Sequence, residues 1–185
     1  MESDFNLDGF ARWANLLVTI SRPFAAKPVE RLTNPKRLRA WLRAVDLDPR
    51  AAPTADDLAA ALELRATLRA LALSTTQGNA PRSKDVRTLG RFLQADDRPT
   101  VAVRDGRLTR ARPADTRAAL ARIAREAADD LTGPQRANLR ECAEHDCRWV
   151  YLDPTGRQRW CSPSCASRGR VRAHRARGRA QTGAA

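Results

Sequence analysis

Four cysteines lie within a single segment of 24 residues near the C-terminal end of the chain. They form two close pairs, Cys142-x4-Cys147 and Cys161-x3-Cys165, with thirteen residues between the pairs. Two such pairs separated by a short insert are typical of a site in which four thiolates hold one Zn²⁺ tetrahedrally. Because a shell of four thiolates leaves no position for water, we expect one structural zinc ion rather than a catalytic one.

The residues between the pairs, RWVYLDPTGRQRW, predict a β-hairpin, because aromatic residues favour strands and DPTG favours a turn. Such a hairpin would return Cys161 to the level of Cys147. Ser162 and Pro163 then suit the N-cap and the first position of a helix, with Cys165 in its first turn. A knuckle, a hairpin and a helix in this order form a treble-clef-like arrangement.

Other interpretations of the four cysteines stay open: disulfide bonds, an iron–sulfur cluster, unrelated buried thiols, or a redox switch that releases zinc on oxidation. The first residues, MESDFNLDGF, lack an apolar leader, and no stretch approaches the roughly 20 apolar residues of a membrane span. We therefore expect a cytoplasmic protein in a reducing compartment, where disulfides are rare. His145 lies inside the first pair and is expected at the surface, since four cysteines complete the site.

Arginines follow the last cysteine without any acidic residue to the end of the sequence. The chain carries a formal net charge of +13, and residues 136–185 hold 11 Lys and Arg against 4 Asp and Glu. Such a surplus favours a polyanionic partner, with DNA ahead of RNA, and a solvated basic tail or a protein-binding finger as alternatives. The candidate nucleic-acid contacts are Arg157, Arg159, Arg168, Arg170, Arg172 and Arg175.

The elements that position this segment are predicted from apolar periodicity. Five helices are expected, and Asn34, Thr54 and Asp115 suit the N-caps of three of them. Asp105-Gly106, at the centre of an alternating stretch, predicts a β-hairpin. The helices are expected over 9–20, 34–45, 54–75, around Val86, Leu89 and Leu93, and over 113–132. Residues 132–134, Thr-Gly-Pro, should end the last helix and mark a domain boundary.

The apolar aromatic residues of this part could line a ligand pocket, but core packing explains them better. They are Phe10, Trp13, Trp41 and Phe92. The chain has two histidines, both after residue 140, so the N-terminal part lacks a histidine-based triad. No paired-carboxylate site or glycine-rich phosphate loop is present either, and we do not expect an enzyme.

The C-terminal segment resembles the CGNR zinc-finger family in its x4/x13/x3 cysteine spacing, the strand WVYLD, the lead-in RQRWCS and the basic helix. Where that family has Cys-Gly-Asn-Arg, this chain has Cys165-Ala166-Ser167-Arg168. The N-terminal part resembles the ABATE domain, described as a stress-induced transcription regulator, in GFARWANLL, LTNPKRLRAWLRAV, LAAALELRATLRAL and LARIAREAADDL. The resemblance implies zinc ligation by Cys142, Cys147, Cys161 and Cys165.

Together these observations predict an α+β protein with a mostly helical N-terminal domain, a β-hairpin and a small C-terminal treble-clef-like zinc finger. We expect an ABATE-like regulatory or ligand-sensing domain over 1–134, a finger with its basic helix over 135–179, and a flexible tail over 180–185. The expected function is that of a DNA-binding transcription regulator with an unidentified small-molecule effector or a homodimeric state. The alternative is a zinc-stabilised protein-interaction adaptor.

Overall fold

The computed structural model describes residues 5, 7, 11–95 and 101–182 of the chain. Helices dominate it, and three short two-stranded antiparallel sheets accompany them, so the α+β class is confirmed. In chain order the elements are α1 (Arg12–Leu17), β1 (Ile20–Ser21), β2 (Val29–Glu30), α2 (Pro35–Ala44), α3 (Ala55–Gln77), α4 (Ser83–Gln94), β3 (Val101–Arg104), β4 (Arg107–Arg110), α5 (Thr116–Thr132), the 3-10 helix η1 (Pro134–Asn138), β5 (Leu139–Glu141), β6 (Val150–Leu152) and α6 (Pro163–Thr182).

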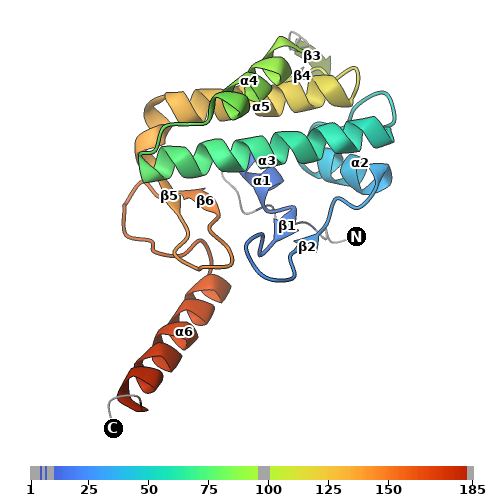
Figure 1. Ribbon diagram of the computed structural model, residues 1–185. Coiled ribbons are helices and arrows are strands. Elements are labelled where there is room, and N and C mark those ends of the chain that lie inside the picture. Colours follow the sequence, from blue (N-terminus) through green and yellow to red (C-terminus); the bar gives the residue numbers. More distant parts are fainter. Residues whose placement is uncertain (1–4, 6, 8–10, 96–100, 183–185) are drawn as a thin grey trace.

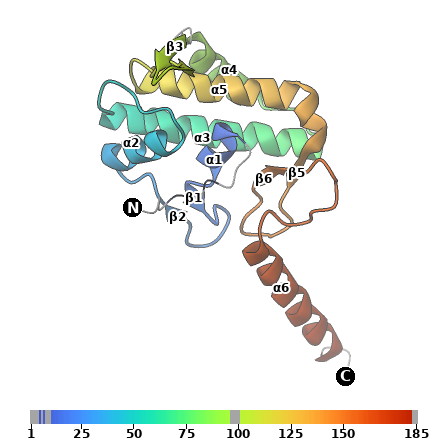
Figure 2. The ribbon, with the colours of Figure 1, turned by 180° about the vertical axis from the view of Figure 1, so that it is seen from behind.

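The long helices α3 and α5 form the centre of the molecule, as Figures 1 and 2 show from opposite sides. Helix α4 packs against both, α1 lies against the same two helices, and α2 packs on α3. The basic helix α6 projects from the lower side of this body. No helix among the described residues has an apolar stretch long enough to cross a bilayer.

The helix starts follow the predicted caps. The side chain of Asn34 accepts a hydrogen bond from the Arg37 amide at 2.9 Å, and Asp115 accepts one from Ala118 at 2.8 Å. Thr54 and Asp57 form a complete capping box at the start of α3. Each such cap stabilises its helix by about 1 kcal/mol, because it satisfies amides that have no partner within the helix.

The predicted aromatic residues pack in the core. Trp13 and Trp41 are fully buried and Phe92 nearly so, while Phe10 lies outside the described residues. The fourth helix differs from expectation at one position: Val86 is half exposed, whereas Leu89 and Leu93 pack against the core as predicted, together with the buried Phe92. Val86 faces solvent, whereas its neighbour Asp85 is buried and accepts a hydrogen bond from Arg82 at 2.7 Å.

The first helix is also shorter than predicted. Helix α1 ends at Leu17, and Ile20 belongs to β1, which pairs with β2 through Ile20 and Glu30. The Thr19 hydroxyl donates to the Leu16 carbonyl at 2.7 Å, which closes the helix one turn early.

The hairpin at Asp105-Gly106 is confirmed. Val103 pairs with Leu108 and Arg104 with Arg107, and the φ angles of Asp105 and Gly106 are 51° and 72°. Two successive positive φ values define the tight turn that suits the right-handed twist of a β-ribbon.

The prediction of a hairpin between the two cysteine pairs is wrong, because the strands pair differently. Strand β6 pairs with β5, which precedes the first cysteine, and residues 157–160 form no strand. The side chain of Asp153 explains this, since it accepts hydrogen bonds from the amides of Thr155 at 3.0 Å and Gln158 at 2.7 Å. These bonds hold residues 153–158 as a compact loop, so the chain turns away from β6 instead of running back along it.

The finger and the helical body share one core. Leu139, Val150 and Tyr151 are buried in the same cluster as the side chains of α3 and α5, and β5 and β6 both pack on α3. The indole of the buried Trp149 donates to the Ala14 carbonyl of α1 at 3.2 Å. The finger is therefore attached to the body by packing as well as by the chain, and α6 alone extends away from it (Figure 2).

Candidate metal centre and basic helix

The four cysteines converge from separate segments of the finger. Cys142 follows β5, Cys147 precedes β6, Cys161 lies between β6 and α6, and Cys165 lies in the first turn of α6. Their sulfur atoms all lie within 4.8 Å of one another. The Sγ atoms of Cys147 and Cys161 are 3.7 Å apart, and those of Cys161 and Cys165 are 3.5 Å apart. All four are free thiols, so the structure contains no disulfide among them.

These distances fit a single ion. Zinc lies about 2.3 Å from a cysteine sulfur, so a tetrahedral site separates its sulfurs by about 3.8 Å. An iron–sulfur cluster contains several iron and sulfide atoms and would hold its cysteines further apart. Four thiols and no further ligand among the described residues form the donor set of a closed structural zinc site.

The pKa values of the cysteines also favour a cation bound between them. A hydrogen bond from Cys147 lowers the pKa of Cys142 to about 2, and the same contact raises the pKa of Cys147 to about 12. Hydrogen bonding to Cys142 and Cys147, together with burial, raises the pKa of Cys161 as well. Neighbouring thiolates repel one another, so several can ionise together only when a positive ion lies between them.

The start of α6 places Cys165 as predicted. The hydroxyl of Ser162 accepts a hydrogen bond from the Cys165 amide at 3.2 Å, and Pro163 is the first helical residue. The guanidinium of Arg168 donates to the Cys165 sulfur at 3.1 Å. A cationic donor at this position stabilises the thiolate that a metal requires.

A buried carboxylate joins residues 142–147, the cysteine knuckle, to α6. The side chain of Glu144 has no exposed surface, and its Oε1 accepts a hydrogen bond from Nε of Arg172 at 3.1 Å. Arg172 also donates to Oδ2 of Asp146 at 2.6 Å, and Nε of Arg168 lies 3.9 Å from Glu144. Neither Glu144 nor Asp146 could be picked out from the sequence, because their partners lie 26 to 28 residues later in the chain. His145 between them is exposed, as expected.

A close contact between Trp160 and Gly169 fixes another side of α6. A Cβ atom on Gly169 would lie 2.6 Å from Nε1 of the Trp160 indole, which only a glycine allows. The guanidinium of Arg159 stacks 5.2 Å above the Trp160 ring and is thereby held beside the helix.

The structure divides the six candidate arginines into two groups. Arg168 is partly covered and Arg172 is about half exposed, but both contact Glu144 of the knuckle. The other four are exposed: Arg157, Arg159, Arg170 and Arg175. Helix α6 continues to Thr182, beyond the start of the segment expected to be a tail.

Comparisons with known protein families agree with this geometry. A family model for the ABATE domain, "Putative stress-induced transcription regulator", matches residues 11–134. A model for the CGNR zinc finger matches residues 138–178, which include all four cysteines. Neither model describes an enzyme family. No curated protein matches the chain significantly.

Proposed function

Because the chain belongs to the ABATE family and carries a CGNR zinc finger, we propose that it is a transcription regulator that binds DNA through helix α6. The observation that carries this proposal is the exposed basic surface of α6 on a helix anchored by the metal knuckle. A helix of 20 residues is about 30 Å long, and the major groove of DNA admits a helix of this diameter.

The charge of α6 supports a polyanionic partner. Its sequence from Pro163 to Thr182 contains six arginines and one histidine and no acidic residue. An isolated helix with this composition repels itself and buries little surface. Binding to a polyanion is therefore favourable, because phosphates neutralise the arginines and counterions are released.

The exposed arginines are the proposed DNA contacts. Arg170 and Arg175 are exposed on α6, and Arg159 is held beside the helix by Trp160. Arg157 lies on the same loop as Arg159. Arg168 and Arg172 serve a different role in this proposal, because their contacts with Cys165 and Glu144 set the direction of the helix.

The helical body is the proposed regulatory part. Because the finger shares its core with α3 and α5, a change in the body can reach the base of α6. A bound effector or a second copy of the chain would supply such a change.

The test measures DNA binding by the zinc-loaded full chain across a salt series. Fluorescence anisotropy of a labelled duplex is the readout. Arg170→Gln with Arg175→Gln should reduce the slope of log affinity against log salt by about 2, since each phosphate contact contributes roughly 0.9. Lys84→Gln with Arg87→Gln on α4 removes the same charge from exposed positions of the body and should leave the slope unchanged.

Two outcomes would contradict the proposal. No binding at low salt would leave the adaptor function, in which α6 contacts a protein. Equal losses from the two double variants would show a general effect of net charge. A duplex RNA competitor added to the same assay distinguishes RNA from DNA as the preferred partner.

A further inference from the structure

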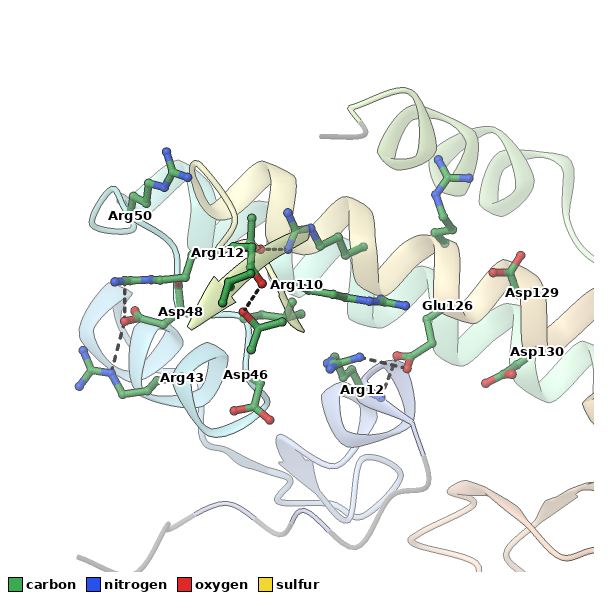
Figure 3. A pocket seen from close by; sticks show the side chains of 17 residues that line it. Arg12, Arg43, Asp46, Asp48, Arg50, Arg110, Arg112, Glu126, Asp129 and Asp130 are labelled. Atoms are coloured by element: carbon green, nitrogen blue, oxygen red, sulfur yellow. Dashed lines mark hydrogen bonds and ion pairs between the residues drawn. The ribbon is translucent and has the colours of Figure 1, made fainter. Parts of the chain in front are cut away.

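The structure contains a large cavity at the far side of the body from α6. It has a volume of about 1280 Å³ and lies between α5, α1, the loop after α2 and the hairpin β3–β4 (Figure 3). Ligand pockets commonly have volumes of about 300–1,000 Å³, so this open cavity is large enough for a small organic molecule. The cysteine cluster takes no part in it.

Arginines outnumber carboxylates in the cavity wall, seven to five. Several of them are paired: Arg12 lies 3.5 Å from Glu126, and Arg112 lies 2.8 Å from Asp48. Among the described residues, Arg50 and Arg110 contact no carboxylate. The wall therefore offers positive charge that no described carboxylate neutralises.

The charges are also separated along α5. Arg122 lies near the hairpin end of the cavity, because it donates to the Ala111 carbonyl just after β4, whereas Asp129 and Asp130 lie about two turns further along the helix. Figure 3 shows the side chain of Arg110 running from β4 across the face of α5. An anionic group is thus favoured at the hairpin end and disfavoured at the other.

The hairpin β3–β4 covers the cavity without being packed into the core. Val103 and Leu108 are 74% and 75% exposed, although a hairpin of this length is only marginally stable alone. Its base is fixed, because Arg122 donates to the Ala111 carbonyl at 2.7 Å and the Arg50 amide donates to Pro113 at 3.1 Å. A ligand beneath the hairpin would contact both Val103 and Arg110, which line the cavity.

We propose that this cavity binds a small organic anion, a carboxylate or a phosphate ester, whose charged group pairs with Arg110 under the β3–β4 hairpin. Arg110 offers the planar, bidentate donor that both anions accept. The apolar part of the ligand contacts Val103 of the hairpin.

Helix α1 connects this cavity to the finger. The amide of Arg12 donates to Glu126 at 2.9 Å, and the Trp13 indole donates to Asp130 at 2.8 Å, both on the cavity wall. The next residue, Ala14, accepts the hydrogen bond from Trp149 of the finger. A ligand that moves α1 would therefore act on the finger. This consequence rests on the proposed function, whereas the binding site itself does not.

The experiment uses the full zinc-loaded chain with ¹⁵N-labelled tryptophan and no DNA. The indole signal of Trp13 reports the cavity, and that of Trp160 reports anions on α6. Citrate and glucose 6-phosphate are the carboxylate and phosphate probes, with glucose and putrescine as neutral and cationic controls at constant ionic strength. We expect a saturable shift of the Trp13 signal with one or both anions and none with the controls.

The variants Arg110→Gln and Arg107→Gln separate the site from general charge. Both lie on β4 of the same hairpin, but only Arg110 lines the cavity. Arg110→Gln should weaken the binding measured at Trp13 about tenfold or more, since a charge-assisted hydrogen bond is lost, and Arg107→Gln should not. Thermal unfolding is an independent readout. The anion should raise the midpoint of the parent and of Arg107→Gln, but not that of Arg110→Gln.

The proposal is overturned if neither anion gives a saturable Trp13 shift or a raised midpoint at millimolar concentration, or if both variants respond alike. A shift confined to Trp160 also overturns it, because it would place the anion on α6. A failure of DNA binding does not affect this test, so the two proposals can fail separately.

Discussion

Two carboxylates that would be ordinary surface residues in a helical protein hold distant segments together here. Glu144 is buried in the cysteine knuckle and accepts a hydrogen bond from Arg172 of α6. Glu30 of β2 accepts one from Arg65 of α3 at 2.8 Å, and Arg65 also donates to Thr19 at 2.8 Å. In each pair an arginine from a helix fixes a short non-helical segment that lacks a core of its own.

The Glu30 pair gives a prediction for pH dependence. Burial alone would raise the pKa of Glu30, but the hydrogen bond and charge of Arg65 and the amide of Leu32 lower it below its ordinary value of 4.5. A lowered pKa means that the folded protein binds a proton less readily than the unfolded chain. The pair therefore stabilises the fold above pH 4.5, and this contribution is lost as the pH falls through the folded pKa.

Glu30→Gln should lower the free energy of unfolding at neutral pH by about 1 kcal/mol, a modest figure because the carboxylate is partly exposed. Urea unfolding at several pH values should show the difference from the parent narrowing below pH 4.5. Because both proteins keep the same cysteines, acid release of the metal affects them equally. A difference that grows toward acid pH would contradict this assignment.

Among the elements, α6 shows how a helix of low apolar content can be held in place. Its first turn carries Cys165, Arg172 contacts the knuckle, and Gly169 packs against the Trp160 indole. A glycine within a helix normally destabilises it by about 1 kcal/mol relative to alanine. Here the glycine permits the contact that positions both Trp160 and Arg159.

Gly169→Ala should therefore destabilise the finger although alanine is the better helix former. The new methyl group would lie 2.6 Å from the indole nitrogen, so Trp160 must move out of its contact. The matched control is Gly90→Ala in α4, where the added Cβ meets no atom within 4 Å. This substitution should raise the free energy of unfolding by about 1 kcal/mol. Competition with a zinc chelator and tryptophan fluorescence measure the effect. Equal stabilisation by both substitutions would show that the contact is unimportant.

At the scale of the whole molecule, the finger and the helical body form one packed unit. A segment of about forty residues cannot bury enough surface to fold alone, and structural zinc supplies roughly 10–16 kcal/mol in zinc-finger peptides. Here part of the finger also completes the body, since Trp149 and Val150 are buried against it. The metal is therefore expected to stabilise both parts.

Removing zinc with a strong chelator should unfold residues 136–175 and also lower the melting temperature of the helical body. Loss of the β5–β6 packing exposes the side of α3 that these strands cover. Circular dichroism during heating, with and without chelator, measures the helical body, and protease sensitivity measures the finger. Restoration of both by added zinc is the control. An unchanged melting temperature beside a digested finger would show that the two parts are energetically independent.

The sequence determined those features that depend on neighbours along the chain. The cap residues Asn34, Thr54 and Asp115 predicted helix starts, and Asp105-Gly106 predicted a hairpin, because each acts within a few residues. Cysteine spacing predicted the metal cluster for a similar reason, since two short pairs need only a return of the chain between them.

Tertiary structure decided the pairings between distant residues. It placed β6 beside β5 because the Asp153 loop closes on itself, a side-chain effect that strand propensity does not contain. It assigned Arg172 to Glu144 and left Arg170 exposed, although both arginines look alike in the sequence. Such pairings depend on where the folded chain brings a carboxylate, and the cavity beneath the β3–β4 hairpin likewise exists only where four separate segments meet.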